Sequence, residues 1–533
     1  MPEKKLPSDN ASSLSGTRLR VQDYTPISGL CALCIPEKCP FICEVSKAAL
    51  RGREALYPEA EEFGFSTAAA SKDYGLDWSD IQLLPNLTEF YGVKGDELFF
   101  EDINVEAKFA GISLKLPVFI AALGSTDIAK KHWVGLAVGA AISGSMIVVG
   151  ENVCGMDEKA VFSQGRVQHS PELERRVKTF REYWDGTYGD VAVQTNVEDE
   201  MMNVDFYALS KLEVNTIEKK FGQGAKSIGG EVRISNIERA IELKRRGYIV
   251  IPDPEDDAVK EAYKRGLIKS FERHSRVKRP DVSSFLERVD KLRENGAKRI
   301  LIKTGAYRPA AVAFTMKLAS MAKADGVTFD GAGGGTGMSP ILMMNESGVP
   351  TLYLEVWTVK AAQILSKRGA HVPDIAMAGG FSSEHHIVKA IALSGFEERP
   401  YVKAVAMART PILAVAKSKY MLELAKEGKL PPEVARKWGT DSTKLFIEYD
   451  GLLREYGSER FNKILESGAI GLYTYFKKLA IGIKILLAGQ RKTSLYLLNR
   501  KDLAALTERA ARVTGLPLID EADEGLFETI LSS

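Results

Sequence analysis

Residues 299–332 read RILIKTGAYRPAAVAFTMKLASMAKADGVTFDGA, and this stretch decides the fold class. Its two ends, RILIKTG (299–305) and GVTFDGA (326–332), are short apolar runs with β-branched residues that close on glycine-containing turns. A longer segment with the composition of a helix joins them. A strand, a helix and a second strand in this order form the βαβ unit of a parallel sheet. The stretch therefore predicts an α/β protein.

The same alternation extends outward from this stretch in both directions. It gives eight apolar runs with polar or glycine-rich ends: PVFIAAL (117–123), MIVVGE (146–151), DVAVQT (190–195), TIEKKFG (216–222), RILIKTG (299–305), GVTFDGA (326–332), DIAMAGG (374–380) and VKAVAMA (402–408). Eight strands close a (β/α)8 TIM barrel, and the span is slightly longer than the ~250 residues typical of that fold. The excess lies between the fourth and fifth runs, where YIVIPDPEDD (248–257) precedes KRGLIKSFERHSRVKRP (264–280). We expect this second stretch, which is basic, to be helical.

Two flanking regions complete the predicted organisation. Residues 1–104 form an N-terminal region that contains most of the cysteines, and residues 105–410 form the barrel. Residues 411–533 are largely near helical period and predict a helical C-terminal extension. A cap on the barrel is favoured over an independent functional domain.

The composition is that of an ordinary globular protein. The 533 residues carry 72 Lys and Arg against 70 Asp and Glu, a net charge of +2, with 45% apolar residues. This balance argues against a nucleic-acid-binding protein or an acidic disordered chain. Apolar runs such as 136–150 are interrupted by Gly and Ser and fall short of the ~20 residues that span a bilayer. The N-terminus MPEKKLPSDN lacks the apolar region of a secretion signal, which predicts a cytoplasmic protein.

Four cysteines lie close together near the N-terminus. Cys31, Cys34, Cys39 and Cys43 follow the spacing C-x2-C-x4-C-x3-C. Four thiolates in a chain without a secretion signal suit a metal ion or an iron–sulfur cluster. The aliphatic residues between them favour a [4Fe–4S] cluster over zinc, and unligated cysteines are the third alternative. The fifth cysteine, Cys154, is expected to be a small buried packing residue rather than a ligand.

Glycine-rich turns follow two late strands. DGAGGGTGMSP (330–340) contains Gly333, Gly334, Gly335 and Thr336, and AMAGGF (376–381) contains Gly379 and Gly380. Backbone amides without bulky side chains are able to approach a phosphate, and late-strand loops of TIM barrels commonly bind one. The chain has no G-x-G-x-x-G motif opening a helix and no G-x-x-x-x-G-K-[ST] motif, which argues against a Rossmann site or an NTPase.

Charged residues lie at the ends of other predicted strands. Lys303 in ILIKTG is a candidate for stabilising negative charge on a cofactor or for binding a substrate carboxylate, with a solvated lysine as the alternative. Lys220, Gln223 and Lys226 follow the fourth strand and are candidates for clamping a dicarboxylate. Glu151 in VVGENVCG is a candidate acid or base, or simply a loop carboxylate.

Together these motifs resemble the FMN-binding synthase domain of glutamate synthase and its shorter archaeal and bacterial relatives. PVFIAALGSTDIAK is similar to the first strand of that family, GENVCG to its second-strand turn and KFGQGAKSIGG to its Q-G-A-K motif. IKTG resembles its lysine strand, and DGAGGGTGMSP and AGGF resemble its phosphate loops. The order and spacing agree from about residue 105 to about residue 410.

The resemblance implies an FMN-dependent oxidoreductase that makes glutamate from 2-oxoglutarate and ammonia. It implies FMN contacts at Ala121, Ala122, Lys303, Gly333, Gly334, Gly335, Thr336, Gly379, Gly380, Ala408 and Arg409. It implies catalytic or substrate contacts at Lys303, Glu151, Gln223, Lys226 and Lys220. Electrons would enter through the cysteine cluster from a ferredoxin or a reductase subunit, because no NAD(P)H fingerprint is present.

Several features depart from the family pattern. The chain starts MPEKK without an amidotransferase-length segment before the barrel, and AVAMARTPILAVAKSKY lacks the cysteines that follow the barrel in the family. GENVCG replaces the family's GEGG, and AGGF continues into SSEHH with His385 and His386, whose role stays open. The alternatives are an FMN and iron–sulfur oxidoreductase with another small substrate, or an electron-transfer subunit. An FMN-dependent isomerase is disfavoured because it has no use for the cysteines. Substrate, electron donor and homo-oligomer formation are left open.

Overall fold

A closed parallel barrel forms the centre of the protein. The computed structural model describes residues 74–93, 95–222, 231–332, 346–396, 399–441, 443 and 445–533, together with the backbone of 68–69 and 335–336. The barrel strands are β5 (Val118–Leu123), β6 (Ile147–Val149), β9 (Val191–Thr195), β10 (Thr216–Phe221), β14 (Arg299–Thr304), β15 (Gly326–Asp330), β17 (Asp374–Ala378) and β20 (Val402–Met407). They pair in the order β10-β14-β15-β17-β20-β5-β6-β9 and close on themselves. Each strand lies within one of the eight predicted runs, so the (β/α)8 prediction is confirmed.

The interior of the barrel is filled unevenly along its axis. The hairpin of β3 (Ala107–Phe109) and β4 (Ile112–Leu114) belongs to the inner cluster, where Phe109 stacks on Phe119 with ring centroids 5.2 Å apart. Its turn is anchored by the Ala110 amide, which donates to Asp374 Oδ2 at 2.8 Å. Near the carboxyl ends the inward positions are small: Ala121, Ala378 and Ala406. The amino-terminal end is therefore closed, whereas alanines leave room at the carboxyl end.

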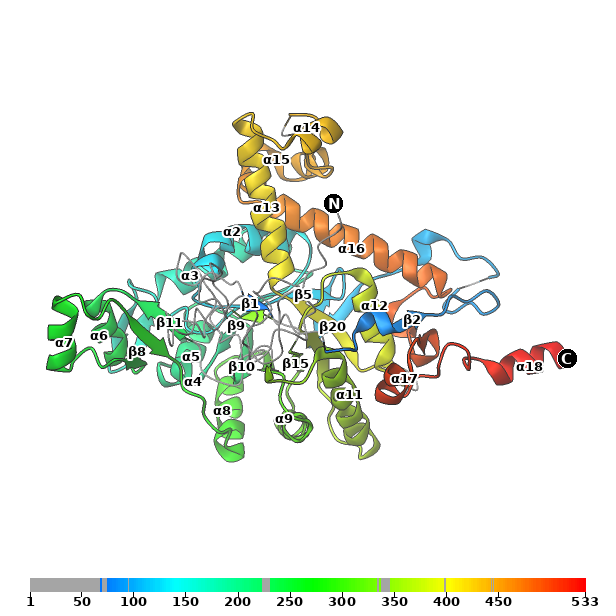
Figure 1. The fold of residues 1–533 in the computed structure, drawn as a ribbon, viewed down its shortest axis with the longest axis horizontal. Helices are drawn as coiled ribbons and strands as arrows, with labels where there is room; N and C mark the ends of the chain where they lie inside the picture. Colours follow the sequence, from blue (N-terminus) through cyan, green and yellow to red (C-terminus); the bar gives the residue numbers. More distant parts are fainter. Residues whose placement is uncertain are drawn as a thin grey trace, which may run out of the picture.

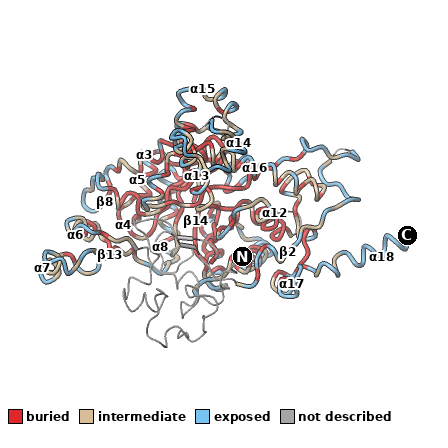
Figure 2. The backbone as a smooth tube through the Cα atoms, turned by 45° about the horizontal axis from the view of Figure 1, so that its top comes forward, coloured by how far each residue is buried: buried red, intermediate tan, exposed pale blue. Residues whose placement is uncertain are grey.

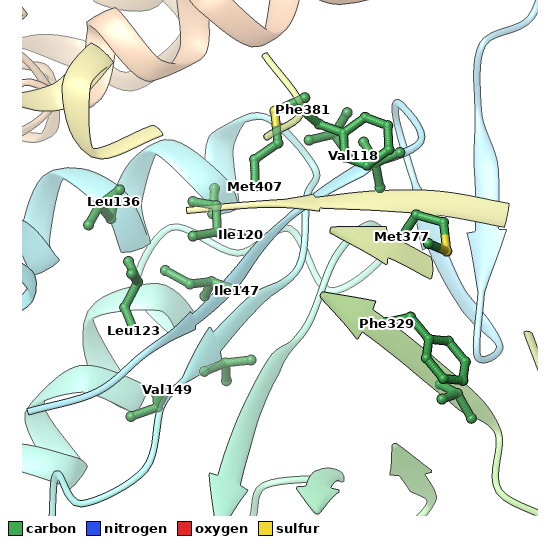
Figure 3. Packing of buried hydrophobic residues seen from close by; sticks show 14 of the residues in the cluster. Val118, Ile120, Leu123, Leu136, Ile147, Val149, Phe329, Met377, Phe381 and Met407 are labelled. Atoms are coloured by element: carbon green, nitrogen blue, oxygen red, sulfur yellow. The ribbon is translucent and has the colours of Figure 1, made fainter. Parts of the chain in front are cut away.

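Helices cover the outside of the barrel (Figure 1). They are α2 (Asp127–Ile142), α3 (Pro171–Arg181), α4 (Val197–Met201), α5 (Val204–Ser210), α8 (Val282–Glu294), α9 (Pro309–Met321), α11 (Thr351–Lys367), α12 (Glu384–Leu393) and α13 (Arg409–Lys426). Strand residues alternate between the two faces, so those that do not fill the interior pack against these helices. Figure 3 shows Ile120 and Ile147 of neighbouring strands with Leu136 of α2 in this outer layer.

A three-stranded sheet is inserted between β10 and β14. It contains β11 (Glu231–Ile234), β12 (Ile249–Ile251) and β13 (Phe271–His274), with α6 (Ile237–Arg245) and α7 (Asp257–Lys264) beside it. The helix expected over residues 264–280 is wrong beyond Lys264, because β13 pairs with both β11 and β12. Phe271 and Arg273 are buried while Glu272 and His274 are partly exposed, which is the two-residue period of a strand.

The C-terminal region is mostly helical. Its helices after α13 are α14 (Pro432–Trp438), α15 (Tyr449–Glu466), α16 (Ala469–Gly489), α17 (Glu508–Thr514) and α18 (Glu524–Ser532). Helix α16 packs against α2 and α13, whereas α18 extends away from the body and is exposed (Figures 1 and 2). Strand β21 (Leu503–Ala505) pairs with β2 (Ile81–Leu83), so segments from both ends of the described chain lie side by side. None of the described helices combines the length and the apolar character that a bilayer crossing requires.

Candidate active site

A cavity of about 580 Å³ opens at the carboxyl ends of the barrel strands. Seven residues predicted to contact a cofactor line it: Ala121, Ala122, Lys303, Gly379, Gly380, Ala408 and Arg409. They come from β5, β14, the turn after β17 and the start of α13, and they meet because parallel strands deliver their carboxyl ends to one mouth. We call this space the mouth cavity.

The other predicted site residues cannot be placed in the mouth cavity. Gly333, Gly334, Gln223, Lys226 and the four cysteines Cys31, Cys34, Cys39 and Cys43 lie outside the described residues. For Gly335 and Thr336 the backbone is described, as β16 (Gly335–Thr336), which pairs with β1 (Ala68–Ala69). The roles of all these residues stay predictions.

The turn after β17 requires glycine. Gly379 and Gly380 have φ angles of +115° and +95°, which side-chain-bearing residues rarely adopt. A Cβ on Gly379 would lie 2.5 Å from Thr351 Oγ1 and 2.7 Å from the Gly331 amide nitrogen. Thr351, at the start of α11, also donates from its hydroxyl to the Gly379 carbonyl oxygen at 2.6 Å. Thr351 therefore fixes the shape of the glycine turn, a role the sequence analysis missed.

Lys303 reaches the mouth cavity from β14 as a buried cation. It is 6% exposed, so the alternative of a solvated strand-end lysine is wrong. Its Nζ lies 3.5 Å from Asp330 Oδ2 at the end of β15. Burial alone would lower the pKa of Lys303, but Asp330, Glu218 and Glu151 outweigh it and the pKa is raised. Lys303 thus stays positively charged at neutral pH.

A second charged group lies beside Lys303 on β10. Lys220 is the register partner of Lys303 across the two strands, and its Nζ lies 2.5 Å from Glu151 Oε1. Burial tends to raise the pKa of Glu151, but Lys220 outweighs it and the pKa is lowered. Lys220 and Glu151, both predicted site residues, therefore form a partly buried ion pair next to the mouth cavity.

Two polar residues inside the barrel were not predicted. Gln194 Nε2 donates to Glu218 Oε1 at 2.5 Å, and burial raises the pKa of Glu218. The opposite atom, Gln194 Oε1, and the buried Thr328 Oγ1 have no hydrogen-bond partner within the part of the chain that the structure describes. Glu218 lies two positions before Lys220 on the same strand, so alternation from Lys220 would have identified it as inward-facing.

The two histidines of the SSEHH segment lie at the start of α12, just after the cavity residues Phe381 and Ser382. Their ring centroids are 4.3 Å apart. Burial lowers the pKa of His386 to about 4, and His385 and Lys389 act in the same direction. His386 is therefore neutral at neutral pH.

Cys154 is buried in the core, as the packing interpretation expects. Burial raises the pKa of its thiol to about 12, with Asp199 adding to the shift. The thiol is therefore not a nucleophile at neutral pH. Among the described residues, no group of His, Cys, Asp and Glu is arranged to hold a metal ion.

The sequence matches a family model described as the conserved region in glutamate synthase, over residues 82–415. The chain belongs to the glutamate synthase family. Over 317 residues it is 26% identical to the archaeal glutamate synthase [NADPH] of Archaeoglobus fulgidus, and the alignment covers 58% of this chain and 52% of that protein. Over 266 residues it is 27% identical to a glutamate synthase large subunit-like protein of Rhizobium meliloti, covering 48% and 55%. The chain thus spans about half the length of these relatives, and the family predicted from the motifs is confirmed.

Solved structures show more distant similarity. A mutant of an active chimera of (S)-mandelate dehydrogenase aligns with a TM-score of 0.42 at 14% identity, over 80% of this chain and 88% of that one. A mutant flavocytochrome b2 with benzoylformate aligns with a TM-score of 0.45 at 13% identity, over 85% and 81%.

Proposed function

We propose that the mouth cavity binds FMN and that the protein is an FMN-dependent oxidoreductase of the glutamate synthase type. The observation that carries this proposal is the meeting of the buried cation Lys303 with the Gly379–Gly380 turn in one cavity, in a chain of this family. The cavity volume of about 580 Å³ lies within the range of cofactor sites. The small residues Ala121 and Ala122 and the Gly379–Gly380 turn leave this space unfilled.

The lining residues divide naturally between the two ends of FMN. The amides of Gly379, Gly380 and the first turn of α13, at Ala408 and Arg409, suit the phosphate, because a helix N-terminus and a glycine turn both present N–H groups to anions. Ala121 and Ala122 leave space for a flat ring, and Lys303 supplies positive charge beside it. When bound, FMN supplies hydride transfer and accepts electrons singly.

The residues beside the cavity suit reductive amination. The net reaction joins 2-oxoglutarate and ammonia, takes up two electrons and two protons, and releases glutamate and water. Glu218, with its raised pKa, is placed to hold a proton at its carboxyl group, with Oε1 oriented by Gln194. Lys303 remains charged throughout and attracts negative charge into the cavity. Lys220, with Gln223 and Lys226, is the candidate contact for the substrate carboxylates.

Electron supply is proposed to run through a cluster on the N-terminal cysteines. The spacing of Cys31, Cys34, Cys39 and Cys43 supports a [4Fe–4S] cluster, with a ferredoxin or a reductase subunit as donor. Iron and acid-labile sulfide should each be near four per chain. Zinc in stoichiometric amount without iron would contradict the cluster.

A different small substrate is the second candidate. The ion pair of Lys220 with Glu151 favours it, because the two side chains are only 9% and 15% exposed and a carboxylate that binds Lys220 competes with Glu151. A substrate with a single carboxylate, bound at Lys303, need not do so. A role restricted to electron transfer is disfavoured, because it gives no use to these buried charges.

One experiment separates these functions. Protein purified without oxygen is reduced with dithionite and mixed with ammonia and 2-oxoglutarate, and flavin reoxidation and glutamate are followed together. We expect one glutamate for each reduced flavin. A protein that binds flavin but forms no glutamate would leave the oxidoreductase with a different small substrate. A protein that binds no FMN would contradict both candidate functions.

A further inference from the structure

Two further cavities lie side by side next to the barrel and share part of their lining. The larger, of about 730 Å³, lies between α4, α8 and the segment that follows β13. The smaller, of about 80 Å³, extends from the same wall to the end of β10. We call the wall that the two cavities share the access groove, and its six residues are Val197, Glu200, Arg276, Val277, Lys278 and Arg288.

Beyond the access groove, the smaller cavity reaches the end of a barrel strand. Lys220 and Gly222, at the end of β10, line the smaller cavity. Lys220 is the register partner of Lys303, which lines the mouth cavity from the neighbouring strand. Adjacent strands lie about 4.8 Å apart. The access groove therefore ends one strand away from the mouth cavity.

The charges along the inner wall are already balanced by ion pairs. Arg288 Nη2 lies 2.6 Å from the buried Asp205 Oδ1. Glu200 Oε1 lies 2.5 Å from the buried Lys219 Nζ, and Arg276 Nη1 lies 3.4 Å from Glu198 Oε1. An anion passing this wall therefore meets little unbalanced charge and is not trapped there.

The rim of the smaller cavity carries exposed cations. Lys278 and Arg279 are exposed, and within the described part of the chain neither forms an ion pair. The opposing charge on the rim is Asp281, which caps α8 and accepts the Ser284 amide at 2.8 Å. Val277 beside these cations is apolar, and low-dielectric walls strengthen the field of nearby charges. Two cations against one carboxylate make the rim a net attractor of anions.

We propose that the access groove is the route by which a small anionic substrate reaches the mouth cavity, steered by Lys278 and Arg279. The identity of that anion as 2-oxoglutarate rests on the proposed function. The balanced inner wall lets the anion pass on to Lys220 and Lys303.

The test compares the FMN-loaded parent with a double variant, Lys278→Glu with Arg279→Glu. The control is Lys264→Glu with Lys269→Glu, two exposed cations of the same insertion that line neither cavity. Stopped-flow mixing with 2-oxoglutarate at low salt reports association through the flavin absorbance. Quenching of flavin fluorescence by iodide, with neutral acrylamide as comparison, reports access by any small anion.

We expect the association rate to fall about three- to ten-fold in the groove variant, and most of the difference to vanish at high salt. Iodide quenching should fall while acrylamide quenching stays the same, and the control should match the parent. Iodide quenching equal to that of the parent would contradict the access groove as the route of small anions, and so would an unchanged association rate. If the parent shows no response to 2-oxoglutarate but the groove variant loses iodide access, the glutamate proposal fails and the groove stands as a route for small anions.

Discussion

The two sides of the barrel mouth present different chemical groups. The side formed by β5, β17 and the start of α13 presents alanine, glycine and backbone amides, and its shape is fixed by contacts such as Thr351 with Gly379. The side formed by β10 and β14 presents charged side chains, Lys220 and Lys303, each held by a carboxylate. We infer that the two sides have different roles: shape holds the cofactor, whereas charge acts on the flavin ring through Lys303 and on the substrate through Lys220.

The largest effect is expected from Gly379→Val on the shape side. The new side chain would meet Thr351 Oγ1 and the Gly331 amide at a backbone angle that valine does not adopt. We expect FMN affinity to fall by at least about 100-fold, which corresponds to about 2.7 kcal/mol. Fluorescence titration of the apo-protein measures it. Gly489→Ala, where a Cβ meets nothing within 4 Å, is the control and should bind like the parent.

Lys303→Met tests the charge side. It leaves the buried carboxylate of Asp330 without its cation, and breaking a buried pair costs about 3 kcal/mol or more. We expect lower stability in urea titrations together with a lower midpoint potential of bound flavin. Lys303→Arg keeps the charge and should restore most of the potential. A potential equal to that of the parent in Lys303→Met would show that the cation does not act on the flavin.

A smaller effect is expected from Thr351→Val, which removes the hydroxyl that donates to the Gly379 carbonyl. Loss of one such hydrogen bond costs about 1 kcal/mol, so FMN affinity should fall roughly five-fold. Thr351→Ser keeps the hydroxyl and should bind FMN like the parent. Equal losses in both variants would assign the effect to packing instead.

The smallest effect concerns His386 and pH. Its pKa is lowered to about 4 in the folded protein, against an ordinary value of about 6.5, so the unfolded chain binds the proton more readily. The contribution of His386 to the free energy of unfolding is therefore complete above about pH 6.5 and is lost as the pH falls toward 4. Urea titrations of His386→Gln should show a shallower decline of the free energy of unfolding over this pH window than those of the parent. The same decline in parent and variant would contradict a partly buried imidazole that is neutral in the folded protein.

The barrel was predictable because strand period, apolar runs and strand-end glycines are local signals. The meeting of Ala121, Lys303 and Gly379 followed from them, since a parallel barrel brings all carboxyl ends together. Contacts between distant segments left no such signal. The Thr351 hydroxyl, at the start of α11, contacts the turn after β17, and β13 pairs with both β11 and β12. Glu218 was missed although its spacing from Lys220 contained the information.

The most direct test of the division between the two sides is Lys220→Ala in the FMN-loaded protein, titrated with 2-oxoglutarate while the flavin spectrum is recorded. Lys220 lies on the charge side and does not line the mouth cavity. The division predicts full FMN content in the variant and loss of the spectral response that the parent gives. Loss of FMN together with the response, or a response equal to that of the parent, would contradict it.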